Sequence, residues 1–165
     1  YIWNCSESLI KDWEIVEMNK CLYKFDITTP ERLRHFLSQT AHESGGGRYT
    51  MELASGQDYE YRSDLGNTQP GDGPKYKGAG YLQITGRANY QSLADYLPDQ
   101  DVMKGCEYVA ITYPFTSAGH WGMNNKMNAL IDAGATVHQV TKKVNGGYNG
   151  IDDRIYYYER CSDII

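Results

Sequence analysis

The stretch FLSQTAHESGGGRYTME, residues 36–52, joins a helical pattern to three consecutive glycines and then to a second glutamate. Around its start, apolar residues recur at helical spacing, at Leu33, Phe36, Leu37 and Ala41. Thr29 followed by Pro30 predicts that this helix begins there, with proline at its first position. One glycine would cap the helix, whereas three cost additional backbone entropy. The triplet therefore indicates a required break in the chain between Glu43 and Glu52.

Glu43 lies at the edge of the apolar stripe and in the last turn of this helix. At about 100° per residue it falls on nearly the same side as Phe36. The negative end of the helix dipole also disfavours a second negative charge there. Both effects favour the protonated form of the side chain near neutral pH. A neutral glutamic acid beside a cleft can protonate the leaving oxygen of a glycosidic bond.

The glycine triplet sets the relation between two carboxylates. Glu43 and Glu52 are nine residues apart, and in one continuous helix they would face opposite sides. A break at residues 45–47 lets the chain turn back, so that Glu52 can face Glu43, and it leaves room for a bulky polymer. On spacing alone, an ordinary helix cap followed by a solvated Glu52 is an equal alternative.

Most of the remaining chain has a helical pattern. A first helix is expected over residues 7–22, with Ser6 as its cap and an apolar face formed by Leu9, Ile10, Trp13 and Val16. A later helix ends at Pro98 and carries Tyr90, Leu93, Ala94 and Leu97 on one face. Short helices follow over residues 117–124, 127–133 and 136–144, the last with Val137, Val140 and Val144 inward. Asp152 and Asp153 open a final helix.

Residues 53–80 have no such period. The segment is rich in Gly, Asp, Asn and Pro, and predicts one long loop with a short hairpin around residues 71–78. Loops of this length inside a domain are usually functional. A short β-like run follows at residues 81–84. The fold class is therefore mainly α, with one long loop and a small hairpin.

Composition limits the class of protein. The 165 residues are 41% hydrophobic and 22% charged, which indicates one globular domain over residues 1–165. A net charge of −5 argues against a nucleic-acid partner, and no apolar run approaches the length of a membrane span. The chain begins at Tyr1 without a methionine, so we expect a domain trimmed from a longer chain.

Cysteine and histidine spacing does not favour a metal site. Cys5, Cys21, Cys106 and Cys161 contain no CxxC, and they could form two disulfides in any of three pairings or remain free. The segment HESGG lacks the second histidine of a HExxH zinc motif. The loop GDGPKYKGAG lacks the ending of a phosphate-binding loop. We expect no metal and no organic cofactor.

Three segments, taken in order, resemble a known family. They are ITTPERLRHFLSQTAHESGG, KYKGAGYLQITGRANY and VNGGYNGIDDR, and they span roughly residues 26 to 158. Each is a weak signal alone, but together they are similar to the family 19 glycoside hydrolases. That family includes chitinases, phage endolysins and other bacterial cell-wall lysins. The resemblance implies a lysozyme-like α-helical fold in which the long loop and the hairpin line a cleft.

The resemblance also implies roles for individual residues. Glu43 would be the general acid, Glu52 the general base, and Thr85 would hold the attacking water. Glu60 is an alternative base, because the long loop could carry it into the cleft. The residues implied to bind sugar are Ser44, Tyr81, Gln83, Asn89, Tyr90, Asn145 and Arg154. The chain departs from the family at Ala79, where an arginine is common.

The function implied is inverting hydrolysis of β-1,4 linkages in the glycan backbone of peptidoglycan, by a bacteriolytic endolysin. Such an enzyme acts at the cell wall, after secretion or phage-type lysis, and further domains of a longer lysin are expected partners. An endochitinase acting on GlcNAc polymers is the alternative with the same chemistry. A non-catalytic glycan-binding domain is the alternative from another class, and it would need neither acid nor base. A purely structural helical domain would leave the glycine triplet unexplained.

Overall fold

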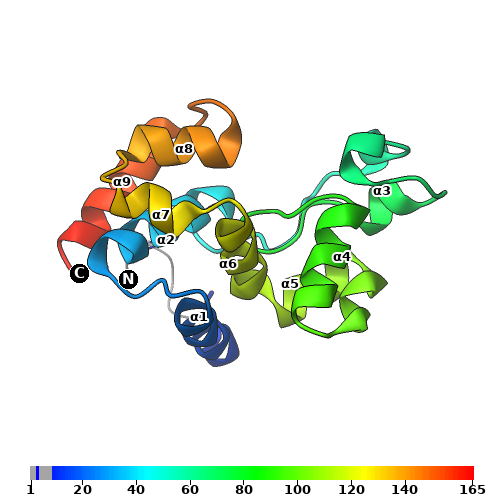
Figure 1. The fold of residues 1–165 in the computed structure, drawn as a ribbon, viewed down its shortest axis with the longest axis horizontal. Coiled ribbons are helices and arrows are strands. Elements are labelled where there is room, and N and C mark those ends of the chain that lie inside the picture. The colour runs from blue at the N-terminus through cyan, green and yellow to red at the C-terminus, as the bar shows by residue number, and fades with distance from the viewer. Residues whose placement is uncertain (1–2, 4–8) are drawn as a thin grey trace.

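The computed structural model describes residue 3 and residues 9–165. Its helices form two lobes, which are joined by a central helix and by loops (Figure 1). The larger lobe contains α1 (Asp12–Lys24), α2 (Pro30–Glu43), α7 (Met127–Asp132), α8 (Val137–Asn145) and α9 (Ile151–Ser162). The smaller lobe contains α3 (Asp72–Lys75), α4 (Arg87–Tyr96) and α5 (Cys106–Thr112), with short 3₁₀ turns at Gln57–Tyr59, Ser63–Leu65 and Gln100–Lys104. The central helix is α6 (Pro114–Asn124).

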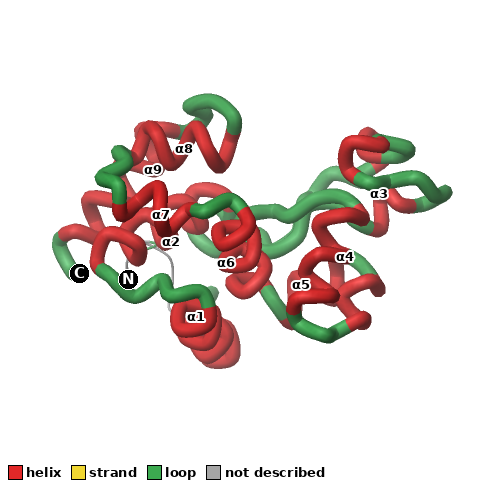
Figure 2. The backbone as a smooth tube through the Cα atoms, in the orientation of Figure 1, coloured by secondary structure: helices red, strands yellow, loops and turns green. Residues whose placement is uncertain are grey.

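The predicted helical class is confirmed: in the described residues Figure 2 shows helices joined by loops and no strand. Helix α2 begins as expected, because the Thr29 hydroxyl accepts a hydrogen bond from the Arg32 backbone N–H at 3.3 Å. Thr136 caps α8 in the same way through Gln139. Helices α4, α7 and α9 also follow the predicted pattern, whereas the Gln100–Lys104 turn and α5 were not predicted.

Helix α1 differs from its prediction in both its start and its orientation. It begins at Asp12, while residues 7 and 8 and the proposed cap Ser6 lie outside the described residues. Trp13 and Val16, expected to face inward, are 41% and 52% exposed. Glu14 and Glu17 are buried in their place, at 5% and 8% exposure. The predicted inward positions of Trp13 and Val16 are therefore wrong, whereas Ile10 does pack against the core.

Glu17 explains this orientation. Its two carboxylate oxygens accept hydrogen bonds from the backbone N–H groups of Phe115 and Thr116, at 2.8 and 2.7 Å. These N–H groups lie in the first turn of α6, where a helix has donors without internal partners and a positive dipole end. A carboxylate there satisfies two buried backbone groups, which an apolar side chain cannot do.

The long loop is confirmed as mostly irregular, but the predicted hairpin around residues 71–78 is wrong. That segment forms α3, and the buried Asp72 carboxylate organises it by accepting hydrogen bonds from the backbone N–H groups of Thr68 and Gln69, each at 3.0 Å. Asp72 also pairs with Arg87 of α4 at 2.6 Å. Residues 81–84 form no strand, and only isolated bridges join Ala79 to Met51 and to Ile84.

Two further expectations concern cysteines and membranes. Cys21, Cys106 and Cys161 are free and buried, while Cys5 lies outside the described residues. The sequence left disulfides and free thiols as alternatives, and the structure has free thiols at these three positions. No helix in the described part of the chain has the length and apolar character needed to cross a bilayer.

The environment of Glu17 predicts a pH-dependent stability. Burial raises the pKa of the Glu17 carboxyl group above its ordinary value of 4.5, against the lowering effect of its hydrogen bonds. A group whose pKa is raised by folding stabilises the folded state at pH values below its unfolded pKa. That stabilisation is lost as the pH rises through the pKa of the folded state. Native protein should therefore lose stability relative to Glu17→Gln as the pH rises from the ordinary value of 4.5 through the raised pKa of Glu17.

Urea unfolding across that pH range measures this difference. Glu107→Gln, which removes an exposed carboxylate on α5, is the matched control and should leave the pH dependence unchanged. Parallel pH profiles for native protein and Glu17→Gln would contradict the prediction.

Candidate active site

Glu43 ends α2 and is held by an arginine from α9. The Arg154 Nη2 atom donates to Glu43 Oε1 at 2.5 Å, and the Glu43 side chain is 22% exposed. Glu43 thus combines contact with solvent and a fixed orientation. Arginine–carboxylate pairs with charge-assisted hydrogen bonds are among the stronger polar contacts in proteins.

Arg154 is fully buried, so its implied contact with sugar is not compatible with this structure. Its Nη1 donates to Gln39 Oε1 at 2.5 Å and its Nε donates to the Asn149 carbonyl at 3.1 Å. Gln39 in turn donates to the Thr141 hydroxyl at 3.1 Å. These contacts fix the guanidinium, which positions Glu43 instead of binding substrate.

A second polar contact joins the same two helices. His42 Nδ1 and Asp153 Oδ2 are 2.7 Å apart, one residue before each member of the Glu43–Arg154 pair. Gly150 makes this contact possible, because a Cβ atom at that position would lie 1.9 Å from the His42 ring. Two adjacent polar pairs therefore hold the end of α2 against the start of α9.

The glycine triplet adopts the conformation that favours glycine. Gly45, Gly46 and Gly47 have φ angles of +60°, +72° and +88°. The chain leaves the helix with Gly46 N–H donating to the Ala41 carbonyl at 2.7 Å. Ser44 is fully buried, with its hydroxyl accepting from Gly47 N–H at 2.8 Å, so Ser44 supports this turn and does not line a cleft.

Beyond the triplet, Glu52 pairs with the predicted sugar-binding segment. Its backbone N–H donates to the Gly78 carbonyl at 2.8 Å, and its Oε2 accepts from Gly78 N–H at 3.0 Å. The Tyr59 hydroxyl donates to Glu52 Oε1 at 3.1 Å. Burial and this hydrogen bond raise the pKa of Tyr59, so the hydroxyl remains a donor. Tyr59 was missed, because nothing in its loop sequence indicated a contact with Glu52.

Glu60, the alternative base, binds backbone groups of its own loop. Its two oxygens accept from the backbone N–H groups of Gly71 and Gly73, at 2.6 and 2.7 Å, at the start of α3. Glu60 therefore closes the long loop on itself. Its contacts are those of a structural residue, whereas Glu52 contacts the segment that carries Gln83.

Gln83 and Thr85 lie partly exposed in the turn that follows Gly78. Gln83 has a φ angle of +54°, an unusual backbone conformation for a residue with a side chain, and its Nε2 donates to the Gly80 carbonyl at 2.8 Å. The Thr85 hydroxyl donates to the Gln83 carbonyl at 3.0 Å. The exposed Asn89 donates to the Thr85 carbonyl at 2.7 Å. One local network thus holds these three predicted residues.

Three other predicted residues have different positions. Tyr81 and Tyr90 are fully buried, and their hydroxyls donate to Glu14 and to the Lys77 carbonyl, at 2.5 and 2.6 Å. Neither tyrosine presents its side chain to a substrate in this structure. Asn145 ends α8 and is exposed, so it remains available to a ligand.

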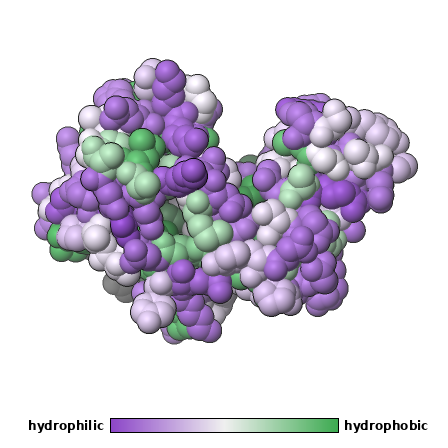
Figure 3. Space-filling view, in the orientation of Figure 1, coloured by the Kyte–Doolittle hydropathy of each residue, from purple (hydrophilic) through white to green (hydrophobic). Residues whose placement is uncertain are grey.

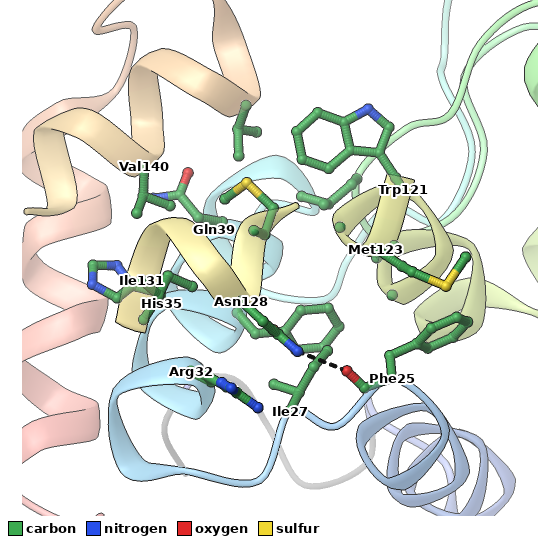
Figure 4. A pocket seen from close by; sticks show the side chains of 17 residues that line it. Phe25, Ile27, Arg32, His35, Gln39, Trp121, Met123, Asn128, Ile131 and Val140 are labelled. Carbon is green, nitrogen blue, oxygen red and sulfur yellow. Dashed lines mark hydrogen bonds between the residues drawn. The ribbon is translucent and has the colours of Figure 1, made fainter. Parts of the chain in front are cut away.

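An apolar pocket lies beside the Arg154 network, among α2, α6, α7 and α8 (Figure 4). Its lining includes Phe36, Gln39, Leu82, Trp121, Met127 and Val140. Asn128 donates to the Phe25 carbonyl at its edge, at 2.9 Å. This lining has few groups that could bind sugar hydroxyls, so we do not assign the glycan to it.

Both the sequence and the fold of the chain are similar to those of known proteins. A Haemophilus influenzae protein named "Glycosyl hydrolase family 19 domain-containing protein" is 28% identical in an alignment 158 residues long, and the match covers 74% of this chain and 74% of that protein. No family model matches the chain. A bacterial family 19 chitinase superposes with a TM-score of 0.77 at 19% identity, covering 98% of this chain and 89% of that one.

Two other solved structures have the same fold. Chitinase C from Streptomyces griseus has a TM-score of 0.73 at 17% identity, covering 99% of this chain and 88% of its own. A class IV family 19 chitinase from Zea mays has a TM-score of 0.72 at 17% identity, covering 98% and 87%. The resemblance to the family 19 glycoside hydrolases is confirmed. The chain therefore has the helical fold of the family 19 chitinases.

The glycine triplet predicts a graded loss of stability. A Cβ atom at Gly47 would lie 2.7 Å from Ile10 Cδ1 and 2.9 Å from Trp3 Cε3, in addition to the backbone cost at φ +88°. Gly134 has a similar φ of +85° but nothing within 4 Å, so Gly134→Ala measures the backbone cost alone. We expect a loss of about 1 kcal/mol for Gly134→Ala and about 3 kcal/mol for Gly47→Ala in urea unfolding. Equal losses would show that packing at Gly47 is unimportant.

Gly78 predicts a loss of activity without a comparable loss of stability. A Cβ atom there would lie 2.7 Å from Gln83 Oε1 and 3.1 Å from Glu52 Oε2, both at the ends of flexible side chains. Gly78→Ala should therefore displace these groups and lower glycan turnover about tenfold or more. Gly122→Ala, where the nearest atom is 3.8 Å away, is the control that should retain activity. Thermal unfolding of both variants checks that they fold, and full activity in Gly78→Ala would exclude this cluster from the site.

Proposed function

We propose that the protein is an inverting glycoside hydrolase that cleaves β-1,4 linkages in the peptidoglycan backbone. The observation that carries the proposal is the arrangement of two carboxylates on either side of the glycine triplet. Glu43 is paired with buried Arg154, and Glu52 is oriented by Tyr59 and Gly78. Each carboxylate is partly exposed and has a defined direction.

In the proposed reaction Glu43 is the general acid. It transfers its proton to the oxygen of the scissile bond, and the departing sugar leaves as an alcohol. Glu52 takes a proton from a water molecule, whose oxygen forms the new bond to the anomeric carbon from the opposite face. The configuration at that carbon is inverted. Glu52 then releases its proton to solvent and the Glu43 carboxylate takes one up, which restores both groups for the next turnover. Arg154 stabilises the Glu43 carboxylate that remains after proton transfer.

Glu52 is preferred over Glu60 as the base. Both oxygens of Glu60 accept backbone N–H groups at the start of α3, and its replacement should loosen that loop more than it affects the chemistry. Glu52 adjoins Gly78 and Gln83, and the Thr85 hydroxyl would hold the attacking water. An inverting mechanism requires the two carboxyl groups to be about 6.5–9.5 Å apart.

Peptidoglycan is the first choice of substrate, because the segments TGRANY and NGGYNG resemble those of phage and bacterial lysins. Action at the cell wall, together with further domains of a longer lysin, belongs to the same proposal. An endochitinase is the second candidate, favoured by the chitinases among the proteins of similar fold. A glycan-binding domain without turnover would need neither Glu43 nor Glu52.

Mass spectrometry of products tests these alternatives directly. Native protein, Glu43→Gln, Glu52→Gln and Glu60→Gln are each incubated with purified peptidoglycan and with chitin hexamer. We expect muropeptide fragments from native protein, a rate at least about a hundredfold lower for Glu43→Gln, a steep loss for Glu52→Gln and a smaller one for Glu60→Gln.

Each other outcome has a defined meaning. Chitin fragments alone would identify an endochitinase, and glycan binding without products would support the non-catalytic domain. An active Glu52→Gln beside an inactive Glu60→Gln would reverse the assignment of the base. NMR of the first product should show the inverted anomer, whereas retention of configuration would exclude the proposed mechanism.

A further inference from the structure

Helix α1 lies on the far side of α6 from the hollow between the two lobes (Figures 1 and 3). It buries Glu14 and Glu17 while it exposes Trp13 and Val16. The two pairs have the same spacing and are displaced by one residue along the helix. A rotation of α1 by about 100° would bury the apolar pair, and that alternative would avoid the desolvation of two carboxylates. The observed orientation therefore requires specific contacts made by the carboxylates.

Glu14 contacts the segment that carries the candidate site. The Tyr81 hydroxyl donates to Glu14 Oε1 at 2.5 Å, in a contact where both residues are buried. Tyr81 N–H donates to the Pro114 carbonyl at 2.9 Å, and the Tyr81 ring lies 4.3 Å from that of Phe115. Because Glu17 binds the same end of α6, Glu14 and Glu17 hold Tyr81 and the start of α6 together.

Tyr81 in turn belongs to the turn that presents Gln83. Gly80 N–H donates to the Thr50 carbonyl at 2.7 Å, and Gln83 N–H donates to the Gly80 carbonyl at 3.1 Å. Gly80 packs so closely on α6 that a Cβ atom would lie 2.0 Å from Ser117 Oγ. The turn therefore has little freedom to move once Tyr81 is fixed.

We propose that Glu14 is a positioning residue of the candidate site, which acts through its hydrogen bond to Tyr81 and sets the placement of Gln83 and Thr85 relative to Glu52. This inference about Glu14 rests on the proposed function only where it predicts an effect on catalysis. Its structural part concerns the order of residues 80–85 and can be measured without turnover. No atom of Glu14 needs to reach the substrate.

The decisive variant is Glu14→Ala, because Glu14 itself is not among the residues that the sequence assigned to substrate, and its partner Tyr81 is fully buried. If the turn is displaced by about 1 Å, kcat should fall about ten- to a hundredfold with little change in KM, measured well below the unfolding temperature. Glu14→Gln keeps a hydrogen-bonding partner for the Tyr81 hydroxyl and should restore most of the activity. Tyr81→Phe should resemble Glu14→Ala, and the double variant should be no worse than either one.

Tyr108→Phe is the matched control. It removes another tyrosine–carboxylate hydrogen bond, from Tyr108 to Asp99 at 2.9 Å, in the smaller lobe. It should cost stability without lowering kcat. If Tyr108→Phe lowers kcat as much as Glu14→Ala, the effect of Glu14 is a general loss of stability and the proposal is wrong.

Hydrogen exchange separates this proposal from the proposed function. In Glu14→Ala the backbone N–H groups of Gly80, Gln83 and Ile84 should exchange faster, while those within α9 keep their rates. If native protein cleaves no glycan, the proposed function fails, and exchange alone decides whether Glu14 orders the turn. Unchanged exchange in Glu14→Ala would overturn the proposal, and so would native kcat where glycan is cleaved.

Discussion

The fully buried guanidinium of Arg154 is the contact on which the candidate site depends. It joins α9 to α2 through Gln39 and Glu43, and it also holds the chain at Asn149. Removal of one partner would leave a buried charge uncompensated, which is far more costly than the loss of a surface ion pair. The same contact that stabilises the larger lobe therefore fixes the direction of the proposed acid.

The smaller lobe is organised by carboxylates and amides that bind backbone groups. Asp72, Glu60 and Asn67 satisfy backbone N–H or carbonyl groups of the loop between Glu52 and α4. These contacts replace the strand ladder that a sheet would provide, and they explain how a loop rich in glycine is ordered. Glu17 has the same chemistry between α1 and α6, whereas Glu14 binds the side-chain hydroxyl of Tyr81. Side chains bound to the backbone thus order the smaller lobe and hold α1 against α6.

Much of the helical framework could be predicted from local signals. The Thr29–Pro30 start, the Thr136 cap and the glycines after Glu43 are effects within one turn of chain, and the structure has each of them. Where the structure differs from the prediction, contacts between residues far apart in the sequence are the reason. Glu17 is buried because α6 needs a cap, and α3 forms within residues 71–78 because Asp72 pairs with Arg87.

The sequence by itself determined the helical class, the break after Glu43 and the resemblance to family 19, because caps, glycine φ angles and short motifs depend on neighbouring residues. Only the tertiary structure decided which predicted site residues are accessible. Ser44, Tyr81, Tyr90 and Arg154 have motif positions like those of Gln83 and Asn145, yet the first four are fully buried. A motif records residue type and order, whereas exposure depends on what the rest of the chain packs against each side chain.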